Sequence, residues 1–197
     1  TGTPLLKVSG LNLGAAATSP ATFSLRGSST LSGDVKTGQT LLVNGDATNS
    51  HATLMAATGF TNAGTITLQT LVGGYNSFLT VTSGTLINTG AINSNAGTGG
   101  GRQISADLTN SGTVNINTNT TLDKSGGIYT NSNAFNIASG ATLTISGSSP
   151  VFNQNGGTLA VNGAFDMTSA TFNYNGGSIT GTPLLKVSGL NLGAAAT

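Results

Sequence analysis

Short segments in which apolar and polar residues alternate recur along most of the chain. Residues 65–68, 79–81, 114–116, 142–145 and 158–161 all show this pattern. A period of two is typical of β-strands with one buried face. Asn-Gly, Ser-Gly and Gly-Gly pairs lie between the segments and favour tight corners, because glycine adopts positive φ at little cost. No stretch has a convincing helical period, so the pattern predicts an all-β chain.

A degenerate corner motif repeats through the chain at intervals of about 20 to 26 positions. It consists of Asn, any residue, Gly, a small residue and an apolar residue, with Asn133 replacing the glycine in one copy. The motif begins at six asparagines: Asn62, Asn88, Asn110, Asn131, Asn155 and Asn175. An apolar residue precedes each asparagine by two or three positions: Phe60, Leu86, Leu108, Tyr129, Phe152 and Phe172.

One corner motif in each of these intervals favours a β-solenoid over an antiparallel sandwich, which also uses short strands but does not need a recurring corner. We expect a right-handed parallel β-helix of about eight coils, each of roughly 22 residues. Equivalent residues of successive coils then stack. The motif asparagines are predicted to form a ladder in which each side-chain amide bonds to the next coil, and the six apolar residues a stack beside it.

A second, longer repeat joins the two ends of the sequence. Thr1–Thr18 and Thr180–Thr197 are identical. We interpret residues 1–179 as one solenoid unit and residues 180–197 as the start of the next identical unit. A natural tandem array is favoured over an engineered overlap, and both readings stay open. In the array, the expected partners are identical units stacked end to end.

Composition narrows the possible partners. Only 6% of residues are charged, the net charge is +1, and the six basic residues are scattered, so no nucleic-acid surface is expected. There is no cysteine, which excludes a disulfide scaffold and is compatible with secretion. No apolar run is long enough to span a membrane. No signal peptide is visible at Thr1, so if the protein is secreted its targeting sequence is expected outside these residues.

The residues that could carry catalysis are few. There is no glutamate, and β-helix enzymes that act on polysaccharides need paired carboxylates. Asp107 and Asp123 are separated by less than one coil, and so are Asp34 and Asp46. His51 is the only histidine and has no Gly-x-Ser-x-Gly motif to accompany it. We therefore expect no enzyme activity, no catalytic residue, no metal site and no cofactor, with the aspartates at solvated corners.

Two further patterns are weighed as minor alternatives. Thr65-x-Thr67 and Thr142-x-Thr144 resemble the threonine rows of ice-binding solenoids, but Asn115-x-Asn117 interrupts the row. The glycine-rich residues 97–101 lack the lysine and helix of a phosphate loop, so they indicate a flexible loop or wide corner.

Residues 33–45 and 60–68, with their glycine corners followed by Leu-Leu-Val and Thr-Ile-Thr-Leu strands, resemble the coils of large bacterial surface proteins. These are the filamentous-haemagglutinin-like adhesins and the passenger stalks of autotransporters. The resemblance covers about residues 30–180 and implies a secreted, right-handed parallel β-helix on a prokaryotic cell surface. The leading hypothesis is a structural module of a long extracellular fibre, stalk or adhesin. A solenoid that binds surface glycans, other fibres or another partner is the alternative, ahead of a polysaccharide-active enzyme or an ice-binding protein.

Overall fold

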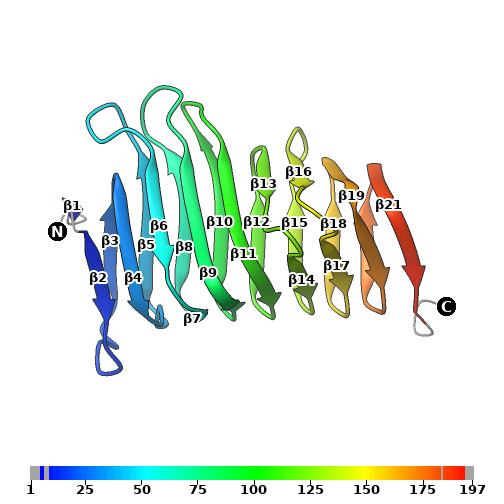
Figure 1. Ribbon diagram of the computed structural model, residues 1–197, viewed down its shortest axis with the longest axis horizontal. Coiled ribbons are helices and arrows are strands. Elements are labelled where there is room, and N and C mark those ends of the chain that lie inside the picture. Colours follow the sequence, from blue (N-terminus) through cyan, green and yellow to red (C-terminus); the bar gives the residue numbers. More distant parts are fainter. Residues whose placement is uncertain (1–4, 7–8, 183, 194–197) are drawn as a thin grey trace.

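The computed structural model describes residues 5–6, 9–182 and 184–193, and it shows a parallel β-solenoid (Figure 1). The chain makes about eight turns of about 22 residues, and the described residues contain no helix. Each turn lies beside the previous one, so the described ends of the chain are at opposite ends of the long axis. The predicted all-β parallel solenoid is confirmed, while its right-handedness stays a prediction.

The first side of the solenoid is a nine-stranded parallel sheet that receives one strand from each turn. In spatial order, its strands are β1 (Leu5–Leu6), β3 (Ala21–Leu25), β5 (Gln39–Gly45), β8 (Thr65–Thr70), β10 (Ala91–Gly97), β12 (Thr113–Ile116), β15 (Ala134–Ile137), β18 (Thr158–Val161) and β20 (Ser178–Gly181).

A twelve-stranded sheet forms the second and third sides, because its long strands turn a corner between them. β9, for example, pairs with β6 through Ser77 to Val81 and with β7 through Leu86 to Asn88. The strands are β2 (Gly10–Leu13), β4 (Ser28–Gly33), β6 (Ala52–Ala56), β7 (Phe60–Asn62), β9 (Ser77–Asn88), β11 (Arg102–Asn110), β13 (Thr120–Leu122), β14 (Ile128–Asn131), β16 (Thr142–Ile145), β17 (Val151–Gln154), β19 (Ala164–Tyr174) and β21 (Leu184–Leu192).

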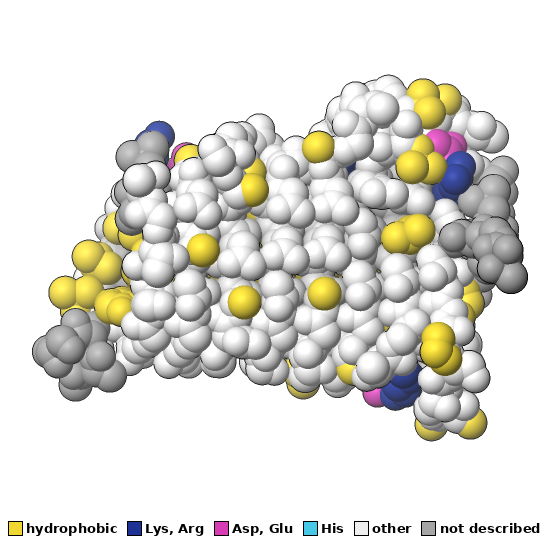
Figure 2. Space-filling view, turned by 180° about the vertical axis from the view of Figure 1, so that it is seen from behind, with side chains coloured by type: hydrophobic (Ala, Val, Ile, Leu, Met, Phe, Trp, Pro, Cys, Tyr) yellow, Lys and Arg dark blue, Asp and Glu magenta, His cyan; other side chains and the backbone are white. Residues whose placement is uncertain are grey.

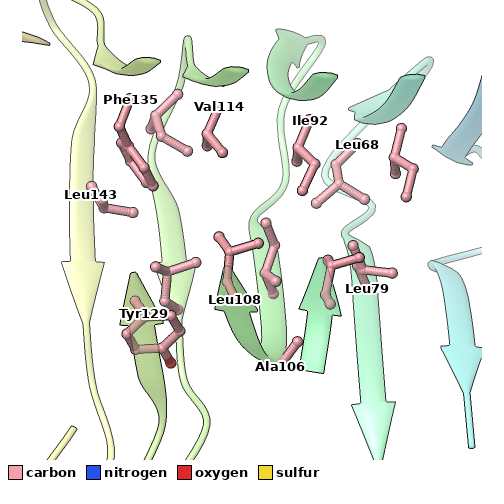
Figure 3. Close-up of a cluster of buried hydrophobic side chains, with 14 of the residues drawn as sticks. Leu68, Leu79, Ile92, Ala106, Leu108, Val114, Tyr129, Phe135 and Leu143 are labelled. Atoms are coloured by element: carbon pink, nitrogen blue, oxygen red, sulfur yellow. The ribbon is translucent and has the colours of Figure 1, made fainter. Parts of the chain in front are cut away.

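The core is a set of apolar columns that run along the solenoid (Figure 3). On the first side, Ile66, Ile92, Val114 and Phe135 occupy the same position of successive turns, and all are buried. Alternation of buried and partly exposed residues within each strand matches the period of two in the sequence. Burial of one such side chain stabilises the fold by about 1.5–3 kcal/mol, and a column shares that burial between turns.

Three connections between strands, called the long turns below, extend beyond the same edge of the solenoid. They connect β5 to β6, β8 to β9 and β10 to β11 (Figure 1). At the start of the third, Gly97 has a φ of 75°, and a Cβ built there would lie 2.0 Å from the carbonyl oxygen of Thr70 in the preceding turn. The close stacking of turns therefore requires glycine at this corner.

Candidate functional site

A buried row of side-chain amides follows the corner between the third and first sides. The Nδ2 of Asn62 donates to Oδ1 of Asn88 at 2.8 Å, and Asn88 donates to Asn110 at 2.7 Å. Asn110 donates to Asn131 at 2.8 Å, and Asn131 donates to Oε1 of Gln154 at 2.9 Å. All five side chains are fully buried. These residues form the asparagine ladder of the solenoid.

Each asparagine of the ladder also donates a hydrogen bond to the backbone of the next turn. The Nδ2 atoms of Asn62, Asn88 and Asn110 donate to the carbonyl oxygens of Ala91, Thr113 and Ala134 at 3.0, 3.1 and 2.9 Å. One side chain thus fixes both the corner of its own turn and the start of the next first-side strand. Such bonds matter because a buried polar group without a partner costs about 1–3 kcal/mol.

The ladder begins at Asn62. Val35 occupies the equivalent position in the preceding turn, where it forms a parallel bridge with Asn62. A valine side chain has no donor, and among the described residues Oδ1 of Asn62 is buried without a hydrogen-bond partner. The unpaired oxygen marks the end of the amide row.

The prediction that Asn155 and Asn175 belong to the ladder is wrong. Gln154 occupies the ladder position, in register with Asn131, and Tyr174 follows it in the next turn. Asn155 lies one residue later and accepts a hydrogen bond from Nδ2 of Asn175 at 2.9 Å on the exposed surface. The reason is visible in the sequence. Asn155 follows Phe152 by three residues instead of two, and strand side chains alternate, so the third residue points away from the core.

The structure places all six residues of the apolar stack in one column. Phe60, Leu86, Leu108, Tyr129, Phe152 and Phe172 are in register from turn to turn, and all are buried. The column passes two residues before the ladder on the third side. Phe152 and Phe172 stack with ring centroids 5.8 Å apart, and Phe165 meets Phe152 edge to face at 5.2 Å. These ring contacts stabilise the column in addition to the burial of apolar surface.

Two further amide rows on the surface were not recognised in the sequence. They are less buried than the ladder, because their side chains point outward from the strands. On the first side Asn115 donates to Asn93 and Asn136 donates to Asn115, each at 2.8 Å. On the third side Asn173 donates to Asn153 and Asn191 donates to Asn173, each at 2.7 Å. Their regular spacing of 18 to 22 residues was the available signal.

Asp46 is the most strongly held carboxylate. It pairs with Arg26 of the preceding turn at 2.7 Å and accepts hydrogen bonds from the backbone nitrogens of Thr48 and Asn49 at 2.8 and 2.7 Å. Burial opposes its charge, but these bonds and those from the Asn49 side chain outweigh it and lower the pKa of Asp46 to about 2. Asp46 therefore braces the turn between β5 and β6.

Asp34 and Asp107 are arranged in the same way, each with a lysine and a backbone N–H. Asp34 accepts from the Thr61 nitrogen at 2.8 Å and pairs with Lys36 at 3.0 Å, and the Thr61 bond holds the pKa of Asp34 below its usual value. Asp107 pairs with Lys124 at 2.9 Å and accepts from the backbone nitrogen of Ile128 at the same distance. These carboxylates connect neighbouring turns rather than face a common groove.

The negative charges of Asp107 and Asp123 both act on the buried hydroxyl of Tyr129. Burial raises the pKa of that hydroxyl. Asp123 accepts hydrogen bonds from Gln103 and Ser105, so both carboxylates are engaged by other side chains. Among the described residues, no group of three or more His, Cys, Asp or Glu side chains could hold a metal ion.

His51 and Arg102 make hydrogen bonds that hold the long turns. Nδ1 of His51 accepts from the Asn76 backbone nitrogen at 2.9 Å, and its ring meets Tyr75 and Phe78 edge to face. Arg102 is buried and donates to the carbonyl oxygens of Asn95, Ala96, Gly99 and Gly101. Burial lowers the pKa of the guanidinium. The glycine-rich residues 97–101 therefore wrap around an arginine side chain as a wide corner.

The second copy of the repeated sequence is wound onto the solenoid as its last coil. β21 pairs in parallel with β19, from Leu184 beside Ala164 to Leu192 beside Tyr174. The second copy begins within β20, where Thr180 and Gly181 pair with Ala160 and Val161 of the preceding turn. Residues 1–4 and 7–8 of the first copy, and residues 183 and 194–197 of the second, lie outside the described part of the chain.

No model of a protein family, no curated protein and no solved structure matches this chain. In the ranges that the structure describes, no helix has the length and apolar character needed to cross a membrane.

Proposed function

We propose that this chain is a structural module of a long extracellular fibre, stalk or adhesin on a prokaryotic cell surface. The observation that carries the proposal is the position of the second repeat copy. Residues identical to the start of the chain form the next coil of the same solenoid and pair in parallel with β19 on both the second and the third side, with a register shift between Met167 and Thr171. Each added unit would therefore continue the same solenoid, so the length of the fibre would grow with the number of units.

The chemistry of the surface supports a mechanical role. Uncharged polar side chains and backbone cover most of the face shown in Figure 2. The paired aspartates, His51 and Arg102 are used by contacts within and between turns. Stacked backbone bonds, the asparagine ladder and apolar columns all act along the long axis, which is the direction in which a fibre carries load.

Electron microscopy of chains with two and four units tests this proposal. Neighbouring parallel strands lie about 4.8 Å apart, so a unit of about eight turns is expected to lengthen the particle by about 40 Å at constant width. The result expected is a thin rod whose length rises in proportion to the number of units. Separate globules joined by flexible connections would contradict the proposal.

A second candidate function is adhesion through the long turns at one edge. The turn between β8 and β9 exposes Leu71 and Val72, and the aromatic cluster of His51, Tyr75 and Phe78 lies close to it. Exposed apolar and aromatic groups on loops are common in sites that bind glycans or proteins. Screening the chain against surface glycans, with a Leu71→Ser, Val72→Ser variant as control, separates an adhesive module from a passive spacer.

A further inference from the structure

The last coil exposes side chains that the same sequence buries elsewhere. Leu190 and Leu192 of β21 are 56% and 70% exposed, and Figure 2 shows hydrophobic side chains gathered at the C-terminal end of the molecule. Leu13, the first-copy equivalent of Leu192, is only 4% exposed. Each of these strands is covered on one side only. β4 of the following coil covers β2, with Leu11 beside Leu31 and Leu13 beside Gly33, whereas β19 of the preceding coil covers β21 and no described strand follows it.

The repeat in the sequence identifies the segment that would cover this edge. In an array, the residues after Thr197 are a second copy of residues 19 onward, and they include the strand that covers the leucines of the first copy. Leu190 and Leu192 continue the apolar column and the ladder position of the third side, in register with Phe172 and Tyr174. The exposed edge therefore fits a further coil of this same solenoid.

The two copies, however, lie at different positions around the solenoid. Leu5–Leu6 pair with β3 on the first side, whereas their equivalents Leu184 and Leu185 pair with Ala164 and Phe165 on the second side. Gly10–Leu13 pair with β4, whereas their equivalents pair with the third-side part of β19. The same sequence therefore occupies two different positions around the solenoid. Only the second copy has a coil before it on which to pair.

The column at the ladder corner fixes the register that an array would need. It runs from Val35 through Asn62, Asn88, Asn110, Asn131, Gln154 and Tyr174 to Leu192. The next member after Leu192 is therefore the following unit's copy of Val35. At the start of the chain the equivalent leucine, Leu13, pairs with Gly33 instead, two residues earlier.

We infer that joining two units shifts the junction segment, residues 10–13, by two residues relative to the coil that follows it. Leu13 exchanges Gly33 for Val35 as its neighbour, and Asn12 exchanges Ser32 for Asp34. A shift of two keeps each side chain on its own face, whereas a shift of one would turn every leucine outward. The inference rests on the proposed array and states which residues make the contact between units.

Coil length agrees with this junction. Register on the first side relates Ser178 to Thr22 through every intervening strand. From Ser178 to the next copy of Thr22, the joined chain is one full coil long, within the range of spacings between the motif asparagines. The first coil, from Leu5 to its partner Ser24, is shorter than any of those spacings. The junction placement is therefore compatible with the coil lengths seen along the solenoid.

Disulfide formation tests the register, because the chain has no cysteine of its own. Asn12, Ser32 and Asn191 are exposed and Asp34 is half-buried, and in-register residues of adjacent parallel strands are close enough for a disulfide. In a two-unit chain, Asn191→Cys is combined with Asp34→Cys or with Ser32→Cys in the second unit. In the single chain, Asn12→Cys is combined with the same two substitutions as the matched control.

We expect the Asp34→Cys pair to oxidise at least tenfold faster than the Ser32→Cys pair in the two-unit chain, and the reverse preference in the single chain. A two-unit rod that still prefers the Ser32→Cys pair would overturn the shift and leave the fibre proposal intact. Failure of both pairs, with the single-chain control oxidising normally and two separate globules in the microscope, would overturn both proposals.

Hydrogen exchange gives a second readout that needs no substitution. In the two-unit chain the amides of residues 189–192 at the junction gain a covering strand, so we expect their exchange to slow at least tenfold relative to the single chain. Unchanged exchange at these amides would show that no coil covers the edge, and would overturn the inference.

Discussion

At the scale of single residues, the solenoid depends on amides and carboxylates that serve two turns at once. Asn110 accepts from Asn88 in the turn before it and donates to Asn131 and Ala134 in the turn after it. It is fully buried, so water cannot replace a lost partner. Asn115 makes side-chain bonds of the same type on the surface, where water can replace them. The two asparagines separate the effect of burial from that of bonding.

We expect Asn110→Ala to lower the free energy of unfolding by about 1–3 kcal/mol, because it leaves buried ladder groups of both neighbouring turns unpaired. Asn115→Ala is the control and should cost less than about 1 kcal/mol, because water can take the place of its partners. Urea denaturation followed by circular dichroism measures both. Equal losses in the two variants would show that the ladder is no more than a surface amide row.

The lowered pKa of Asp46 predicts how the stability of the fold depends on pH. Its folded pKa of about 2 lies below the ordinary value of 3.8, so its stabilisation is complete above about pH 4 and is lost as the pH falls through about 2. We expect Asp46→Asn to be less stable than the parent at pH 7 by about 1–2 kcal/mol, after allowance for solvent screening. The difference should disappear near pH 2. A gap that is constant between pH 7 and pH 2 would assign the effect to the loop geometry alone.

At the scale of strands and corners, the contact between successive backbones limits which residues can form a turn. Gly97 and Gly140 both have positive φ, of 75° and 78°. A Cβ at Gly97 would lie 2.0 Å from the Thr70 carbonyl oxygen, whereas nothing lies within 4 Å of one at Gly140. The two corners share the backbone conformation and differ only in how closely the preceding turn approaches.

Substitution by alanine should therefore separate conformational strain from steric contact. Gly140→Ala is expected to cost about 1–2 kcal/mol, the usual penalty for a side chain in the left-handed region. Gly97→Ala should cost at least about 1 kcal/mol more, because the turn must also move away from β8. Thermal or urea unfolding of both variants gives the comparison. A larger loss for Gly140→Ala would contradict the packing of this corner.

At the scale of the whole molecule, stability is expected to be uneven along the axis. Every inner turn pairs with a neighbour on each side, whereas β1 and β2 at one end and β20 and β21 at the other pair on one side only within the described part of the chain. Solenoids behave as linear arrays in which each turn is stabilised mainly by its nearest neighbours. Terminal turns should therefore open more often than central ones.

Native-state hydrogen exchange measures this directly. We expect the slowest amides in the central strands β11, β12, β14 and β15, and protection at least tenfold lower in β2, β20 and β21. Exchange at the same rate in all strands would indicate that the chain opens as one cooperative unit. The comparison also shows how much stability a further unit could add at the ends.

Local patterns explain how much of this structure could be predicted from the sequence. The period of two and the glycine corners predicted strands and turns, and the recurrence of Phe60, Leu86, Leu108 and Tyr129 beside an asparagine placed a column correctly. The same motif predicted the wrong position for Asn155 and Asn175. These two asparagines follow the preceding apolar residue by three positions, whereas the ladder asparagines follow it by two. The surface amide rows and the partners of Asp107 and Asp123 depend on register between turns, which the motif does not describe.

The amino-acid sequence by itself determined that this chain forms a parallel solenoid, because alternation and corner residues act within a single turn. Tertiary structure alone decided which side chain enters the ladder at each corner, as Gln154 does in place of Asn155. It also decided where a repeated segment lies, since Leu5 and Leu6 pair on the first side whereas the identical residues Leu184 and Leu185 pair on the second. The physical reason is that strand pairing is set by the edge that a neighbouring coil presents, and identical residues meet different edges at the two ends of the unit.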